Sequence, residues 1–257
     1  MSIPNSIAGY YGQEKETYAI KPSDIALGQK MELPDGRSFR LALAGGVALT
    51  PGLLVSPPST ANDHGASAGS GMVIPTAVAV GDTSITVTNG ATTAVTKDMF
   101  AEGFITTQVG TGLGYVYKIK SCASAAVSAT VTLNLYETDH VAATVAAGTT
   151  KAGLKKNPYS ALVVFPAGTI VGPPMGIPPT ACASSYYFWL QRHGEVQAGV
   201  SATVLVTGAP VCAATALNGF VGPVIANSAL YWQNTPIGFA LNSVTAAEYA
   251  TIFLTLE

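Results

Sequence analysis

The sequence has few charged side chains. Asp, Glu, Lys and Arg make up 10% of its 257 residues, against about 25% in ordinary soluble proteins. The net charge is −2, and the 12 basic residues are spread along the chain, so the concentrated basic face that a nucleic-acid binder needs is missing. The hydrophobic content of 48% excludes intrinsic disorder. Because so little charge leaves little polar cover for a lone particle, we expect much of the surface to be hidden against other subunits.

Long apolar runs are also missing. No charged residue lies between Glu195 and Glu248, but glycines, prolines and asparagines interrupt this stretch repeatedly, whereas a membrane helix needs about 20 continuous apolar residues. The opening residues, Met1–Ile7, lack the basic start and the apolar run of a signal peptide. We therefore expect a protein made in the cytoplasm, without a membrane partner.

Cysteine and histidine are scarce, with three of each. Cys122, Cys182 and Cys212 form no Cys-x-x-Cys pair and have no flanking histidines, so their spacing fits neither a disulfide scaffold nor a zinc site. We expect buried, reduced thiols, and neither metal nor cofactor. His64, His140 and His193 are expected in solvated loops, with His193 in a polar turn that ends an aromatic strand.

What is present is a series of short β-strand patterns without a strong helical signal. They are rich in β-branched residues and are separated by Gly, Pro and Asn. In residues 130–136, Val131, Leu133 and Leu135 share one face. The other candidates are 84–88, 104–107, 115–120, 161–165, 186–191, 203–207, 237–242 and 251–256. This spacing predicts an all-β fold with one or two small barrel or sandwich units.

The N-terminal segment differs from the rest. Residues 1–40 hold ten of the 26 charges, and Tyr10, Tyr11 and Tyr18 show no alternation. We predict an extended arm over residues 1–29, which orders against a neighbour. Composition marks 56–71 as a linker, and lysines gather at 151–158. The predicted β-domains are therefore residues 30–150 and 151–257.

Two motifs resemble catalytic or nucleotide-binding loops. Gly65–Gly69 fits the G-x-S-x-G nucleophile elbow, which would place Ser67 with Asp139 and His193, but neither the strand before it nor the helix after it is predicted. Gly110–Gly114 has G-x-G-x-G spacing and is followed by a strand, which favours a hairpin turn over a phosphate loop. With so few titratable groups to form a cleft, we predict no catalytic residues and no enzyme.

The aromatic run Tyr186–Gln191 places Tyr187 and Trp189 on one face of a strand, and Tyr186 and Phe188 on the other. A central strand in a two-sided core explains this pattern. Alternatively, one face packs on a neighbouring subunit, since aromatic residues anchor interfaces.

Several segments resemble the decoration (cement or auxiliary head) proteins of tailed bacteriophages. The resemblance begins with Asp-Gly-Arg-x-Phe-Arg at 35–40 and Ala-Leu-x-x-Gly-x-Leu at 48–54. It continues with 101–120, 187–191 and 236–241, so that these short motifs extend from about residue 34 to the end of the chain. It implies a β-rich, non-enzymatic protein, often a trimer, that binds the outer face of an icosahedral shell.

The expected function is therefore that of a structural virion protein on the capsid surface. It would bind the major capsid protein and itself as a homotrimer, bridge capsomers and so stabilise the phage head, without a nucleic-acid partner. The candidate interface residues are Tyr10, Tyr11, Tyr18, Arg37, Phe39, Arg40, Tyr187, Trp189 and Trp232. The alternative is a head-fibre or spike component that binds host glycans through Tyr231 and Trp232. A major shell protein is disfavoured because no 20-residue amphipathic pattern supplies its spine helix.

Overall fold

The chain divides into two compact units, which differ from the predicted domains. The computed structural model describes residues 6–58, 64, 71–168, 172–201, 204–225 and 235–257. One unit, here called the inserted unit, is Thr60–Pro158; the other, the split unit, combines Met1–Ser59 with Tyr159–Glu257. The predicted boundaries at 29/30 and 150/151 were wrong because the first segment of the chain pairs with the last one rather than with the segment that follows it.

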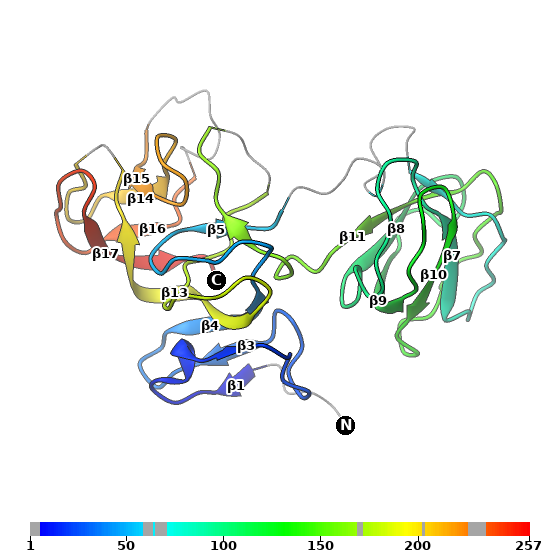
Figure 1. Cartoon of the computed structure of the whole chain (residues 1–257), viewed down its shortest axis with the longest axis horizontal. Coiled ribbons are helices and arrows are strands. Elements are labelled where there is room, and N and C mark those ends of the chain that lie inside the picture. The colour runs from blue at the N-terminus through cyan, green and yellow to red at the C-terminus, as the bar shows by residue number, and fades with distance from the viewer. Residues whose placement is uncertain (1–5, 59–63, 65–70, 169–171, 202–203, 226–234) are drawn as a thin grey trace. The chain divides into compact units, whose positions relative to one another are not determined.

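The inserted unit is a six-stranded sheet (Figure 1). Its strands are β6 (Met72–Val73), β7 (Ser84–Thr88), β8 (Phe104–Val109), β9 (Val116–Cys122), β10 (Thr130–Leu135) and β11 (Lys151–Lys155). The strand order is β6-β11-β8-β9-β10-β7, and β6 and β7 at the two ends of this order also contact each other. The sheet therefore nearly closes into a barrel, as all-β domains do to protect their edges.

Alternating side chains give this barrel its core. Val131, Leu133 and Leu135 of β10 are buried, while the residues between them are exposed, as their period of two predicted. The whole of one core cluster, from Met72 to Leu154, comes from this unit. Fully burying an aliphatic side chain contributes roughly 1.5–3 kcal/mol, so this contiguous segment carries its own source of stability.

His64 belongs to this core, contrary to the prediction of a solvated loop histidine. Its ring packs edge-on against Phe100, with 5.3 Å between ring centroids, and its Nε2 lies 3.0 Å from Asn89 Oδ1. The Asn89 amide donates to the carbonyls of Thr93 and Ala126. Oδ1 is therefore the acceptor in the contact with His64. The buried histidine thus has a hydrogen-bond partner within the protein in place of water.

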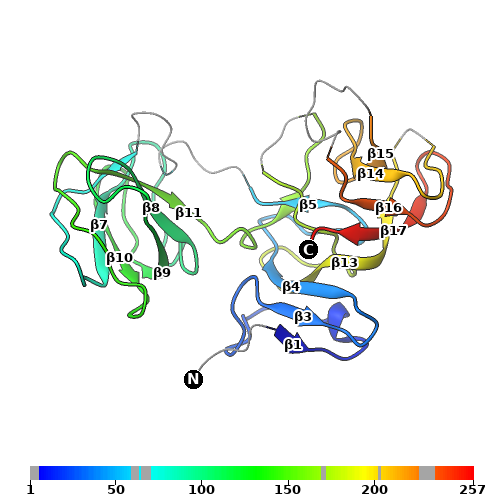
Figure 2. The ribbon, with the colours of Figure 1, turned by 180° about the vertical axis from the view of Figure 1, so that it is seen from behind.

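The split unit is built around a nine-stranded sheet (Figure 2). Its strands are β1 (Ser6–Ala8), β2 (Thr17–Tyr18), β3 (Lys30–Glu32), β4 (Ser38–Leu43), β13 (Tyr187–Gly199), β14 (Pro210–Ala213), β15 (Val221–Pro223), β16 (Gly238–Ala240) and β17 (Tyr249–Thr255). The order is β1-β3-β4-β13-β17-β16-β14-β15, with β2 also paired to β13. A 3₁₀ helix, η1 (Gln13–Lys15), lies between β1 and β2, and β5 (Val55–Ser56) pairs with β12 (Val163–Val164).

The central strand β13 is longer than predicted. The polar residues at 191–195, predicted to be a turn, form a β-bulge where the register with β4 shifts between Gln191 and His193. Gly194 has φ of +88°, and a Cβ there would lie 2.7 Å from Arg37 Cγ. Glycine thus lets the strand kink beside Arg37 and continue to Gly199.

Both faces of the aromatic part of β13, residues 188–191, are buried, which confirms the two-sided core there. Phe188 packs in a cluster with Ala42, Val55 and Leu162 on one face. Trp189 packs with Met31, Phe39 and Leu41 on the other. Partly buried Ile7, Tyr18 and Ile25 cover this second cluster, so the segment predicted as an arm for a neighbour is part of the chain's own sheet.

The strand predictions were most accurate in the inserted unit. Strand β7 has the predicted bounds, and β8 and β9 form the predicted hairpin. In the split unit, the strand predicted at 161–165 is reduced to β12. Of the strand predicted at 203–207, residue 203 lies outside the described chain, and Leu205 forms only an isolated bridge to Val244. No helix in the described part of the chain has the length and apolarity needed to cross a membrane.

Candidate functional site

Two of the three tyrosines of the N-terminal segment, Tyr10 and Tyr18, share one hydrogen-bond acceptor. Tyr10 Oη donates to Glu16 Oε1 (2.8 Å), and Tyr18 Oη donates to Glu16 Oε2 (2.6 Å). Burial, followed by the bond to Glu16, raises the pKa of Tyr18 to about 12. Tyr10 and Tyr11 are exposed, whereas Tyr18 is half-buried. Of the three predicted contact residues, Tyr10 and Tyr11 therefore present most of their side chains to a partner.

Two predicted interface residues lie in the core instead. Phe39 and Trp189 have no exposed surface and pack in the same hydrophobic cluster, so neither can anchor a partner. Tyr187 packs against this cluster and is half-buried. The predicted aromatic pattern was correct, but the covering element is the chain's own segment 7–33. Trp232, Tyr231 and Ser67 lie outside the described residues.

Arg40 belongs to a cluster of charged side chains around Glu257. Arg40 Nε and Ser38 Oγ donate to the Glu257 carboxylate, and Arg192 Nε lies 3.6 Å from it. Burial would raise the pKa of this carboxyl, but the bonds from Arg40 and Ser38 and the charge of Lys30 outweigh it, so the pKa lies below its ordinary 4.5. Arg40 therefore joins the two segments of the split unit, which accounts for its position without a partner.

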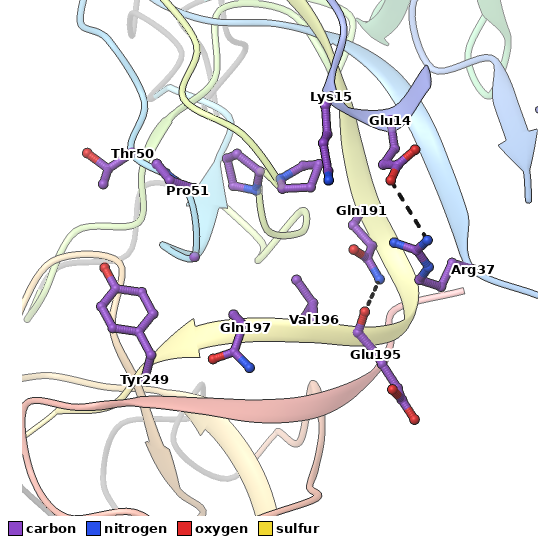
Figure 3. Close-up of a pocket in the computed structure, with 13 residues that line it drawn as sticks. Glu14, Lys15, Arg37, Thr50, Pro51, Gln191, Glu195, Val196, Gln197 and Tyr249 are labelled. Atoms are coloured by element: carbon purple, nitrogen blue, oxygen red, sulfur yellow. Dashed lines mark hydrogen bonds and ion pairs between the residues drawn. The ribbon is translucent and has the colours of Figure 1, made fainter. Parts of the chain in front are cut away.

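Arg37 is held on one side of a pocket of about 430 Å³ in the split unit (Figure 3). Its Nε donates to Asp35 Oδ2 (2.7 Å), and its Nη2 lies 3.8 Å from Glu14 Oε1. Glu14 is buried, and its Oε2 accepts a bond from Gly12 N (2.6 Å). Arg37, predicted as an interface residue, thus lies at an accessible hollow together with a buried carboxylate.

The pocket has a polar end and an apolar end. Glu14, Lys15, Arg37 and Gln191 form the polar end, and Tyr249 lies at the opposite end beside Thr50 and Pro51 (Figure 3). Prolines 178 and 179 and Val196 add further apolar wall. Small-ligand pockets have volumes of roughly 300–1,000 Å³, apolar walls and a few placed polar groups, and this hollow fits that description.

The pocket residues were missed by the sequence analysis, Arg37 excepted. They come from η1, from the turn before β5, from the Pro-Pro dipeptide at 178–179, from β13 and from β17. No spacing in the sequence links these five segments. The visible local signals, the charged group around Glu14 and the Pro-Pro pair, do not by themselves indicate a site.

In the inserted unit, the glycine-rich connection is the predicted hairpin turn. Gly110, Gly112 and Gly114 all have positive φ, which glycine adopts at no steric cost. Thr111 fixes the turn, because its Oγ1 accepts a bond from Ala146 N (2.6 Å) and lies 3.3 Å from Thr150 Oγ1. Beside exposed Gln108 and Thr111, this turn and its flanks present four large apolar side chains that are 42–56% exposed: Val109, Leu113, Tyr115 and Val116. We call these four residues the apolar hairpin end.

The catalytic and metal-binding alternatives gain no support from the described residues. Asp139 lies in the inserted unit, where its Oδ2 accepts a bond from Lys118 N (2.5 Å); His193 lies in the split unit, edge-on to Phe253. No group of three His, Cys, Asp or Glu side chains in the described chain is placed to hold a metal ion. The three cysteines are free and buried, as predicted, and burial raises the pKa of Cys182 and Cys212 to about 11.

Comparison with protein-family models, with curated proteins and with solved structures found no match to this chain.

Proposed function

We propose that this chain is a structural virion protein that binds the outer surface of a tailed-phage capsid as a homotrimer and stabilises the shell by bridging capsomers. The resemblance at residues 35–40 and 48–54 supports this proposal, as does the charged content of 10%. A surface that meets protein rather than water tolerates such a low charge.

The observation that carries the proposal is the apolar hairpin end. Four large apolar side chains stand exposed within eight residues of one turn, Val109–Val116. Exposed apolar residues that are scattered singly are ordinary, whereas several of them at one turn are typical of an interaction surface. The major capsid protein is the proposed partner of this surface.

The hairpin end is also rigid, which favours tight binding. Thr111 and Thr150 hold the turn to the neighbouring segment, and Thr107 Oγ1 donates to the carbonyl of Gly112. The ring of Tyr115 stacks on buried Tyr117, 6.1 Å between centroids. Because the turn and the Tyr115 ring are held before binding, the association loses less conformational entropy.

Stabilisation of the shell follows from mass action. A protein that binds neighbouring capsomers together, and not the free capsomers, adds its binding free energy to the assembled state only. In a symmetric shell the same small contact is repeated many times, and a trimer multiplies it through avidity. The mechanism needs no catalytic group.

The test is light scattering coupled to size-exclusion chromatography, with the purified protein alone and with empty heads of the phage that carries its gene. We expect a trimer that comigrates with the heads. Leu113→Ser should reduce the bound fraction at least about tenfold, as loss of a central apolar contact does. Val127→Ser, which changes an exposed valine outside the hairpin end, is the matched control and should bind normally. A monomer that stays out of the head peak would refute the proposal.

A further inference from the structure

We propose that the 430 Å³ pocket of the split unit is a binding site for a neutral saccharide. The pocket brings together a buried carboxylate, two cations, a buried amide and an exposed tyrosine ring. This site goes beyond the proposed function, which uses the hairpin end of the other unit.

The polar end of the pocket offers hydrogen-bond acceptors. Glu14 Oε2 is occupied by Gly12 N, but Oε1 lies 3.8 Å from Arg37 Nη2, beyond hydrogen-bonding distance. Gln191 donates through Nε2 to the carbonyls of Glu195 (2.7 Å) and His193 (3.2 Å). Its amide orientation is thereby fixed, and Figure 3 shows its oxygen turned toward the middle of the pocket. Two oriented acceptors thus face the ligand space.

Donors stand beside these acceptors. Arg37 is held by its Nε bond to Asp35 (2.7 Å), which leaves its Nη groups directed past Glu14. Lys15 lines the same end of the pocket, and Figure 3 shows it alongside Glu14. Guanidinium and ammonium groups donate and never accept. Acceptors and donors therefore alternate around one small volume.

This alternation selects the chemistry of the ligand. The charges that line the pocket balance, because Glu14 and Glu195 are acidic and Lys15 and Arg37 are basic. Neither an anion nor a cation is therefore strongly favoured. A hydroxyl group both donates and accepts, so it can bridge Glu14 and Arg37 without a charge of its own. A rigid molecule with several hydroxyl groups can therefore pair with the donors and acceptors at this end of the pocket.

The apolar end completes the match. The Tyr249 ring packs against Gly52, where a Cβ would lie 2.6 Å from the ring, and 47% of the tyrosine remains exposed. Pro51, Pro178 and Pro179 form the adjoining walls. A sugar ring has a face of C–H groups that packs on such surfaces, and its hydroxyls project from its edge. A saccharide therefore matches both ends of the pocket.

The test uses the methyl glycosides of glucose, galactose and N-acetylglucosamine as probes, with saturation-transfer NMR and calorimetric titration of the full chain. We expect at least one glycoside to bind, with transfer strongest to its ring C–H protons. Tyr249→Ala and Lys15→Ala should each weaken binding about tenfold. Both side chains are exposed, so the thermal unfolding midpoint should not change.

Tyr186→Ala is the matched control, because Tyr186 is an exposed tyrosine of the same unit and does not line the pocket. Failure of all three glycosides to bind would overturn the inference, as would equal binding by Tyr249→Ala and the wild type. A marked preference for a sialic acid glycoside over the neutral ones would contradict the charge argument. Capsid binding is measured separately with Leu113→Ser, so that either proposal can fail alone.

Discussion

The two units of this chain reach the same all-β architecture by different means. The inserted unit is one continuous segment, and its hydrophobic core cluster runs from Met72 to Leu154. The split unit is assembled from two segments, and its central strand β13 pairs with β4, which lies about 150 residues earlier in the chain. In the inserted unit, the apolar side chains of one continuous segment form the core. In the split unit, the core forms only when two distant segments pair.

The two units also differ in their ion pairs. Of the seven ion pairs found among the described residues, six lie in the split unit, and the remaining pair, Lys120–Glu137, is exposed. Glu257 connects Lys30 and Arg40 of the first segment with Arg192 of the second. Two of the ten charged residues of 1–40, Lys30 and Arg40, thus pair with the second segment of the split unit. Ion pairs are therefore found where the apolar periodicity alone does not determine which strands pair.

Separating the two units should give the largest effect. A polypeptide of residues 60–158 should fold alone, because its core and all six of its strands lie within it. A fragment of residues 30–150, the comparison, lacks β11 with buried Ala152 and Leu154 and should not fold. Chemical denaturation and amide NMR dispersion measure both. A 60–158 fragment without a cooperative transition would show that the units are not independent.

Glu257→Gln should weaken the contact between the two segments of the split unit. The variant lacks the negative charge that accepts the bonds from Arg40 and Ser38, so the split unit should lose about 1–2 kcal/mol of stability. The loss is small because the carboxylate is partly solvated. Since the pKa of Glu257 is lowered on folding, the wild type keeps this stabilisation above pH 4.5 and loses it as the pH falls through the folded pKa. Urea denaturation of wild type and variant between pH 3 and 7 (roughly the carboxyl range) should show the difference shrinking in acid.

Glu137→Gln is the control for this experiment. Its carboxylate is 84% exposed and lies 3.7 Å from Lys120 in the inserted unit, so no measurable change is expected. Equal losses in the two variants would contradict the distinction between the two units.

Cysteine labelling should give the smallest perturbation. Burial raises the pKa of Cys182 and Cys212 to about 11 from 9.0, which leaves roughly a hundredfold less reactive thiolate near pH 8. A fluorescent maleimide should therefore react slowly with the native protein. During heating, Cys122 should report opening of the inserted unit and the other two cysteines opening of the split unit. Simultaneous labelling of all three at every temperature would argue for a single cooperative body.

Sequence patterns predicted the strands better than their partners. Val131, Leu133 and Leu135 show the buried face of β10 directly, because alternation is a local property. The pairing of Trp189 with Leu41 has no local signal, so the domain boundaries were wrong. Phe39 and Trp189 were predicted to lie at an interface because burial in a core and burial in a contact give the same pattern. The pocket was missed because it exists only after six segments, including the turn that carries Arg37, have come together.

The division of the split unit has a consequence for the order of synthesis. Strand β4 carries buried Phe39 and Leu41, and its partner β13 begins only at Tyr187. At about 5–20 residues per second on the ribosome, β4 waits on the order of ten seconds, while the inserted unit can already fold. β4 can pair with β3 at once, but during that interval its other edge, which later pairs with β13, is open to other chains. The first fifty residues are therefore the part of the split unit that is most open to mispairing during synthesis.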